Sequence, residues 1–370
     1  VSNATLVGAG VLSVQAGGSA VLTSVSSGAT LTVSSGAIIN GTMVLANGVE
    51  TITSGGTATG TFVSSGGSAV VSSGGAISNT IISGGGQLNV SGGAQISGYL
   101  QLLGGAQVSG TLTVSTGSVL QIASGYALNV SSGQTSSVTL LNNGFVNVFA
   151  GGIASGTLIS SGGLEVVSSG GIASNTTISS GGALQLLGGA RVSGTLSVSA
   201  GGNLQIASGY NLNVTSGQTS AVFILNGGVE NVSSGGIASG TLVSSGGRAV
   251  VSSGGAISNT IISSGGQLNV SGGARISGYL QLQGGAQVSG ALTISSGSVL
   301  QIASGYALYV SSGQTSSVTL LNSGVENVIS GGIASGTLIS SGGLEIVSSG
   351  GIASNTTISS GGALQLLGGA

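Results

Sequence analysis

Five glutamates and three arginines are the only charged side chains among the 370 residues of this sequence, so any acid–base chemistry depends on them. The glutamates share one position, the second residue after a glycine or glycine pair in a repeated pattern: Glu50, Glu165, Glu230, Glu326 and Glu345. Two facing carboxylates could act as a general acid and a general base. In our alignment the glutamates do not fall on consecutive repeats. We therefore expect neither an acid pair nor a catalytic row.

The glutamate side chains can have one of two orientations. In a strand, position two lies on the same face as position four, which holds branched aliphatic residues and is expected to face the core. Either the strand bends at a corner and turns position two outward, or the carboxylates lie inside against backbone N–H groups. Because a buried, unpaired carboxylate costs several kcal/mol, we expect a corner position with hydrogen bonds.

The composition excludes most other chemistry. Histidine, cysteine, lysine and aspartate are absent, so the usual nucleophile–base pairs and the familiar zinc and calcium ligands are missing. We expect no catalytic residue, no metal site and no cofactor. Three isolated arginines cannot form a patch that binds nucleic acid. Arg248 and Arg275 replace polar residues of an earlier copy of the same segment, which indicates exposed positions.

Serine and tyrosine are the remaining side chains with functional potential. Serine pairs precede many of the Gly-Gly pairs, and their hydroxyls would form exposed rows suited to modification or to hydrogen bonding with a neighbouring molecule. Alternatively, serine is only a small polar turn residue. The tyrosines are either aromatic platforms for a sugar or rim residues that stack along the molecule: Tyr99, Tyr126, Tyr210, Tyr279 and Tyr306, which each follow Ser-Gly, and Tyr309.

An internal repeat positions all of these residues. Residues 151–169 read GGIASGTLISSGGLEVVSS, and a related segment follows at 170–187. A longer repeat contains this shorter one, because residues 151–190 and 331–370 differ only at Val166 and Ile346. More widely, 51–190 matches 231–370. We therefore expect a single solenoid over 1–370 that contains an internal duplication.

Each half-repeat has the pattern of a short strand followed by a turn. Apolar and polar residues alternate, as in Leu184-Gln185-Leu186, and glycine or serine ends the run. A unit of about 20 residues cannot bury its own apolar face, but stacked units can pair in parallel ~4.8 Å apart. The sequence predicts an all-β fold, a right-handed parallel β-helix of about 19 coils with roughly 19–21 residues per coil. A β-sandwich or barrel array is the alternative, which the constant repeat length disfavours.

Position four should form the central ladder of the core. It holds a branched aliphatic residue in each repeat that we aligned: Ile52, Val71, Val90, Val167, Leu186, Val232 and Val328. Apolar runs of about 20 residues, as a transmembrane helix needs, do not occur. The first residues, VSNATLVGAG, have no charged-then-apolar pattern of a signal peptide.

The repeat resembles that of a known family. Segments 55–73, 151–169 and 235–253 are similar to the passenger repeats of AIDA-type autotransporter adhesins, which include the self-associating antigen and Tib adhesins of Gram-negative bacteria. Matching segments cover a little over half of the chain, whereas coils that read LQIASGYALNVSSGQTSSV depart from the pattern. The resemblance implies a right-handed β-helix that is exported through an outer-membrane β-barrel and displayed on the cell surface.

The resemblance also implies a function and partners. Such passengers mediate cell adhesion, autoaggregation and biofilm formation, through self-association or through contacts with host-cell surfaces or glycans. They are commonly O-heptosylated on repeat serines by a dedicated heptosyltransferase. The family's translocator barrel and signal peptide are missing here, so we expect a passenger fragment or a mature segment. The serines that match the repeat serines are Ser160, Ser161, Ser168, Ser169, Ser179, Ser180, Ser340, Ser341, Ser348 and Ser349.

Several functions remain open at this stage. The first is a non-enzymatic adhesin in which many weak contacts along the repeat add up to firm attachment. A passive stalk and a self-assembling fibre are variants of the same rod. A carbohydrate-active β-helix, such as a polysaccharide lyase, is disfavoured because it needs acidic, basic or calcium-binding clusters in a groove. An ice-binding solenoid would need regular Thr-X-Thr arrays, and threonine is too irregular here.

Overall fold

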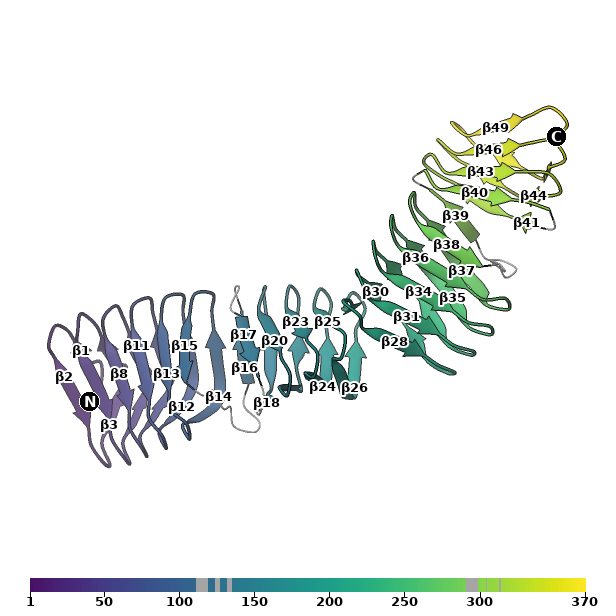
Figure 1. Ribbon diagram of the computed structural model, residues 1–370. Helices are drawn as coiled ribbons and strands as arrows, with labels where there is room; N and C mark the ends of the chain where they lie inside the picture. Colours follow the sequence, from purple (N-terminus) through teal and green to yellow (C-terminus); the bar gives the residue numbers. More distant parts are fainter. Residues whose placement is uncertain (111–118, 124–126, 132–134, 291–298, 304, 313) are drawn as a thin grey trace. The chain divides into compact units, whose positions relative to one another are not determined.

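A computed structural model describes the chain except for residues 111–118, 124–126, 132–134, 291–298, 304 and 313. The described residues form strands and turns, with no α-helix among them. Their strands pair in parallel, each coil with the next, as in β2–β5 and β43–β46. The result is a β-solenoid of about 17 turns, where about 19 were predicted, and it confirms the predicted all-β architecture of stacked parallel coils (Figure 1).

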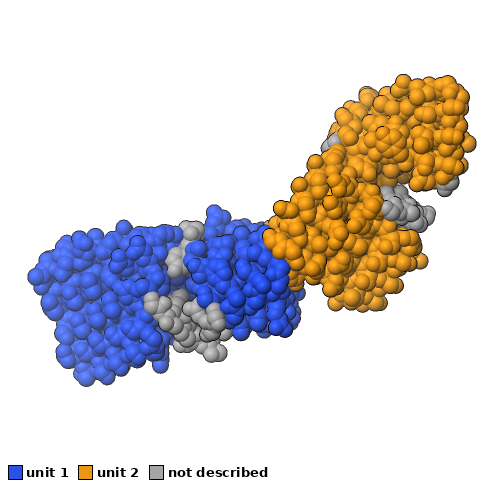
Figure 2. Space-filling model, viewed as in Figure 1, with its two compact units in different colours: residues 1–203 blue, residues 204–370 orange. Residues whose placement is uncertain are grey.

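The chain divides into two compact units, Val1–Asn203 and Leu204–Ala370 (Figure 2). Successive four-residue strands begin 18 to 20 residues apart within each unit, slightly less than the predicted coil length. At the division this spacing is interrupted, because β27 begins at Asn203 and the next four-residue strand, β28, already begins at Asn211. A single solenoid domain over 1–370 therefore stays a prediction.

Each coil has three sides. The first short side is a strand of two or three residues, a corner follows, and the second short side leads to a turn and then to a four-residue long side. In one coil these are β21 (Ile153–Ser155), β22 (Leu158–Ile159) and β23 (Leu164–Val167). In some coils the two short sides are one strand bent at a bulge, as in β24 (Ile172–Ile178), whose register shifts between Ser174 and Thr176.

The long sides form ladders along each unit. In the first unit they are β2 (Val11–Val14), β5 (Thr30–Val33), β8 (Val49–Ile52), β11 (Ser68–Val71), β13 (Gln87–Val90), β15 (Gln107–Gly110), β17 (Ala127–Val130), β20 (Phe145–Val148), β23 and β25 (Ala183–Leu186). In the second unit they are β28 (Asn211–Val214), β31 (Val229–Val232), β34 (Arg248–Val251), β36 (Gln267–Val270), β38 (Gln287–Gly290), β40 (Ala307–Val310), β43 (Val325–Val328), β46 (Leu344–Val347) and β49 (Ala363–Leu366).

The short sides form the other ladders. In the first unit they are β1 (Thr5–Leu6), β3 (Ser19–Val21), β4 (Ser24–Val25), β6 (Ile38–Asn40), β7 (Met43–Val44), β9 (Thr57–Thr59), β10 (Phe62–Val63), β12 (Ala76–Ile82), β14 (Gln95–Leu102), β16 (Val119–Ile122), β18 (Thr135–Ser136), β19 (Val138–Leu140), β21, β22, β24 and β26 (Arg191–Val198). Strand β27 (Asn203–Ile206) lies at the division between the units. The short sides that follow it are β29 (Thr219–Ser220), β30 (Phe223–Ile224), β32 (Ile237–Ser239), β33 (Leu242–Val243), β35 (Ala256–Ile262), β37 (Arg275–Leu282), β39 (Val299–Ile302), β41 (Thr315–Ser316), β42 (Val318–Leu320), β44 (Ile333–Ser335), β45 (Leu338–Ile339), β47 (Ile352–Ser354) and β48 (Thr357–Ile358).

The core lies inside the coils and consists of stacked aliphatic side chains. The four residues of a long side alternate outward and inward, so the second and fourth point into the core. The predicted position-four ladder is confirmed, because each of its residues is at most 4% exposed: Ile52, Val71, Val90, Val167, Leu186, Val232 and Val328. Burial of these ladders is the main favourable contribution to folding.

Gly-Gly pairs allow the turns to stack closely. Gly181 has a φ of +75°, which disfavours other residues, and a Cβ there would lie 2.9 Å from Ser161 Oγ of the preceding coil. At Gly182 a Cβ would approach the carbonyl oxygen of Ile159 to 2.4 Å. The first glycine therefore supplies the turn conformation, and the second lets one coil pass closely over another.

Candidate functional site

Rows of paired serines mark the turns on both sides of the long strands. In most pairs the second serine is exposed, whereas the first is partly buried. Among the predicted acceptors the exposed set is Ser161, Ser169, Ser180, Ser341 and Ser349. The partly buried set is Ser160, Ser168, Ser179, Ser340 and Ser348. The structure thus separates ten serines that the sequence could not distinguish.

Backbone hydrogen bonds fix these serines in place. The carbonyl of Ser160 accepts from the N–H of Gly163 at 2.9 Å, which closes the turn, and the N–H of Ser160 donates to the Leu140 carbonyl of the preceding coil. Ser161 occupies the turn itself, and its hydroxyl leans toward Gly181 of the next coil. The exposed hydroxyls therefore recur along the stack on a backbone held at fixed spacing.

The five glutamates form a second feature, and they lie inside the core. Each is fully buried at the second position of a long side: Glu50, Glu165, Glu230, Glu326 and Glu345. The expectation of an outward-turned corner position was wrong. The strand does not bend at this position. Its fourth residue, for example Val167 in the strand that carries Glu165, also points inward.

Hydroxyl groups, not backbone N–H groups, face these carboxylates. Thr61 donates to Glu50 at 3.4 Å, Thr241 to Glu230 at 3.2 Å, Thr337 to Glu326 at 3.0 Å and Thr356 to Glu345 at 3.2 Å. Ser220 and Ser316 also donate to Glu230 and Glu326. The threonines follow the corner between the short sides and lie eleven residues after the glutamate. That regular spacing is the sequence signal that could have revealed the internal position.

Burial makes these carboxyls weak acids. It raises the pKa of Glu50 from 4.5 to about 7, although the Thr42 and Thr61 hydroxyls oppose the rise. Burial also raises the pKa of Glu165 to about 7, opposed by Thr157, which makes no hydrogen bond of good geometry. Burial raises the pKa values of Glu230 and Glu326 as well, and their serine and threonine donors lower them. All five carboxyls therefore hold their protons to a higher pH than an exposed glutamate does.

Glu326 and Glu345 contradict our expectation that no two consecutive coils carry glutamate. They are register partners on β43 and β46. Burial, followed by the charge of Glu326, raises the pKa of Glu345 to about 7, and the Thr356 hydroxyl opposes the rise. Both side chains are closed to solvent, so a polymeric substrate could not reach this acid pair.

The arginines lie at the surface as predicted, and the three tyrosines that lie on described strands have no tyrosine as register partner. Tyr99, Tyr279 and Tyr309 are 37%, 37% and 65% exposed, and their register partners are Val119, Val299 and Asn327. Tyr210 and Tyr306 are half-buried, and Tyr126 lies outside the described residues. The three arginines are exposed: Arg191, Arg248 and Arg275. Groups of three or more acidic or other metal-ligating side chains do not occur in the part that the structure describes.

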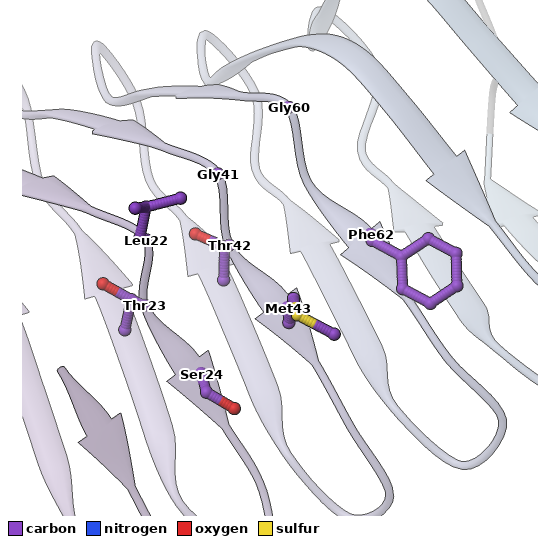
Figure 3. A pocket seen from close by; sticks show the side chains of 8 residues that line it. All are labelled: Leu22, Thr23, Ser24, Gly41, Thr42, Met43, Gly60 and Phe62. Carbon is purple, nitrogen blue, oxygen red and sulfur yellow. The ribbon is translucent and has the colours of Figure 1, made fainter. Parts of the chain in front are cut away.

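A shallow groove of about 230 Å³ lies on the second short side of the first unit (Figure 3). Its outer wall is apolar, because Leu22 and Met43 are 59% and 48% exposed and Phe62 lies beside Met43 on the next coil. Its lining residues include no acid, base or cation: Leu22, Thr23, Ser24, Gly41, Thr42, Met43, Gly60 and Phe62. The groove therefore has no arrangement suited to acid–base catalysis. Across the described residues, no helix has the length and hydrophobicity that crossing a membrane requires.

The sequence matches no protein-family model and no curated protein. Several solved structures are similar. One of them is the crystal structure of a TibA fragment that is hyper-glycosylated in a reaction catalysed by TibC. The two sequences are 25% identical, and the match covers 99% of this chain and 96% of that chain with a TM-score of 0.30. The fold assignment rests on the strand pairing described above.

Proposed function

We propose that this chain is the passenger region of a bacterial surface adhesin, exported through the outer membrane, that mediates cell adhesion, autoaggregation and biofilm formation. The observation that carries the proposal is the regular array of exposed serines on a stacked parallel scaffold, in segments that resemble passenger repeats. Many coils offer a similar small polar surface. Contacts too weak to matter singly add up when many coils engage together.

We further propose that the serine rows are O-heptosylated by a dedicated heptosyltransferase. Charged residues make up only 2% of the chain and the net charge is −2, so the protein surface itself supplies little electrostatic solubility. Sugars on the turns would supply hydration without disturbing the core, because the turns project from the edges of the long strands. The exposed second serine of each pair is the expected acceptor, and the partly buried first serine is not.

Site-directed variants separate the two serines. In a chain co-expressed with its heptosyltransferase, we expect alanine at Ser161, Ser169 and Ser180 to remove one heptose per substituted site from the intact mass. Alanine at Ser160, Ser168 and Ser179 is the matched control and should leave the mass increment unchanged. An unmodified species of 34.4 kDa from the native host would contradict the glycosylation proposal.

Adhesion itself is tested by display on cells. Cells that present the chain should clump, and clumping should require the chain on both partners if self-association is the mechanism. Binding of displaying cells to bare host cells or glycans would instead indicate a heterotypic contact. If neither occurs with the glycosylated chain, the chain is a passive stalk.

A further inference from the structure

The internal glutamates have no opposite charge to neutralise them. Around Glu326, the packed strands β40, β41, β42, β44, β45 and β46 carry two other titratable groups: Glu345 in register with it, and Tyr309 at an outward position. The strands packed around Glu345 carry Glu326 alone. Those around Glu50 and Glu165 carry none. Arg248 on β34 lies close to Glu230 in the ladder, but its side chain is exposed. Its register partner is Val229, which faces outward.

Their hydrogen bonding is also incomplete for ionised carboxylates. Glu165 has no partner for either carboxylate oxygen, and Glu50 Oε2 and Glu345 Oε1 also lack one. An ionised carboxylate can accept about four hydrogen bonds. A protonated carboxyl accepts fewer hydrogen bonds and donates one. The geometry suits the neutral acid, since a buried charge without a cation or a full set of donors is very costly.

The fold itself does not require glutamate at this position. The register partners of Glu165 are Val146 and Leu184, which are fully buried in the same column. Glu50 lies between Leu31 and Ala69 in the same way. An aliphatic side chain therefore fits the position, and glutamate adds a titratable group to a core that would close without it.

We propose that the internal glutamate column is a pH-sensitive element, which holds the coils together while its carboxyls are protonated and weakens them as the carboxyls ionise, most strongly at Glu326 and Glu345. The two side chains face one another across adjacent strands, which lie ~4.8 Å apart. Two charges at that separation in a dry interior repel strongly. The pair therefore shares its protons, and the second ionisation opens the coils locally.

The direction of the effect follows from proton linkage. A carboxyl whose pKa is 4.5 in the unfolded chain and about 7 in the folded chain binds more protons when folded over that interval. Stability is therefore greatest below about pH 4.5, falls as pH rises to about 7 and is constant above it. Each such glutamate should raise the unfolding equilibrium constant about 10²-fold across the interval.

The test compares denaturant unfolding of the full chain at pH 4.5, 6 and 8 with that of a variant carrying glutamine at all five positions. The midpoint of the unaltered chain should fall with rising pH, and the midpoint of the glutamine variant should not. Arg248→Gln, which removes an exposed charge, is the control and should keep the pH dependence. An unaltered chain whose midpoint does not change between pH 4.5 and 8 would overturn the proposal.

Two further measurements do not depend on the variant's folding. The infrared spectrum of the folded chain at pH 6 should show the carbonyl band of protonated carboxyl groups, and its absence would refute the protonated column. Hydrogen exchange should show amides of β43 and β46 opening more at pH 8 than those of β13, which carries Leu88 in place of glutamate. If Ca²⁺ or Mg²⁺ restored the midpoint at pH 8, the carboxylates would be cation ligands and the proposal would be wrong.

Discussion

Glu326 and Glu345 lie directly opposite one another on adjacent coils, and both are fully buried. The donors to Glu326 are Ser316 and Thr337, and the donor to Glu345 is Thr356. Like charges at register positions destabilise a pair of strands even at a solvent-exposed site. Inside the core the same relationship ties the protonation of one carboxyl to that of the other.

A double-mutant cycle on this pair should show strong coupling. At pH 8 either Glu326→Gln or Glu345→Gln removes the repulsion, so each single substitution stabilises the chain. The double substitution should then stabilise it by less than the sum of the two, with a coupling of roughly 0.5–3 kcal/mol. Denaturant unfolding measures all four chains, and additive values would show that the carboxyls do not interact.

Substitution of Glu165 by leucine should change the stability of the chain by an amount that depends on pH. Its carboxylate oxygens lack hydrogen-bond partners, and Leu184 of the next coil shows that leucine fits the column. Burial raises the pKa of Glu165 from 4.5 to about 7, so the carboxyl costs stability only above about pH 4.5. Glu165→Leu should stabilise the chain by about 3 kcal/mol at pH 8.

At pH 4 the same leucine should have a much smaller effect, because the carboxyl is then neutral in both the folded and the unfolded chain. Urea unfolding at the two pH values provides the comparison. An equal gain at both pH values would mean that side-chain volume, rather than ionisation, determines the effect.

Gly182, the second glycine of its turn, should not tolerate a side chain, although Ala37 and Ala190 occupy the equivalent turn position in other coils. A Cβ on Gly182 would lie 2.4 Å from the Ile159 carbonyl oxygen, and backbone cannot move aside without breaking the ladder. Gly182→Ala should destabilise the chain by roughly 2–4 kcal/mol. Gly92 is the matched control, because it has no positive φ and a Cβ added there would meet no atom within 4 Å. Thermal unfolding of Gly92→Ala should differ little from that of the unaltered chain.

The sequence predicted those parts of the fold that depend on local pattern. Alternation within each long strand identified Val71, Val167 and Val328 as core residues, and the Gly-Gly pairs identified the turns. Both signals depend on neighbours in the chain. The ladder of one coil on the next followed from the constant spacing of the repeat.

The glutamate site could not be predicted in the same way. The cost of a buried carboxylate favoured an outward position, but Thr61 and Thr337, which lie on another side of the coil, supply donors that the strand itself lacks. Recognising them requires the three-sided cross-section. The Glu326–Glu345 pair, by contrast, follows from the sequence, because the two glutamates are 19 residues apart and most long strands begin 19 residues after the one before.

The corner between the short sides provides a last prediction, at Asn175. This residue has a φ of +52°, and its Oδ1 accepts the N–H of Thr195 on the next coil at 3.1 Å. The side-chain amide thus replaces a ladder hydrogen bond where the register of β24 shifts. Gly156 occupies the same corner one coil earlier with a φ of +72°, so the corner accepts either residue type.

Two substitutions at Asn175 separate the conformation from the hydrogen bond. Asn175→Gly keeps the positive φ but removes the acceptor for Thr195, and should cost about 1 kcal/mol. Asn175→Ala removes the acceptor and also places a Cβ in a strained conformation, so it should cost about 2 kcal/mol. Denaturant unfolding ranks the three chains. If alanine and glycine cost the same, the backbone strain at this corner is negligible and the hydrogen bond alone selects asparagine.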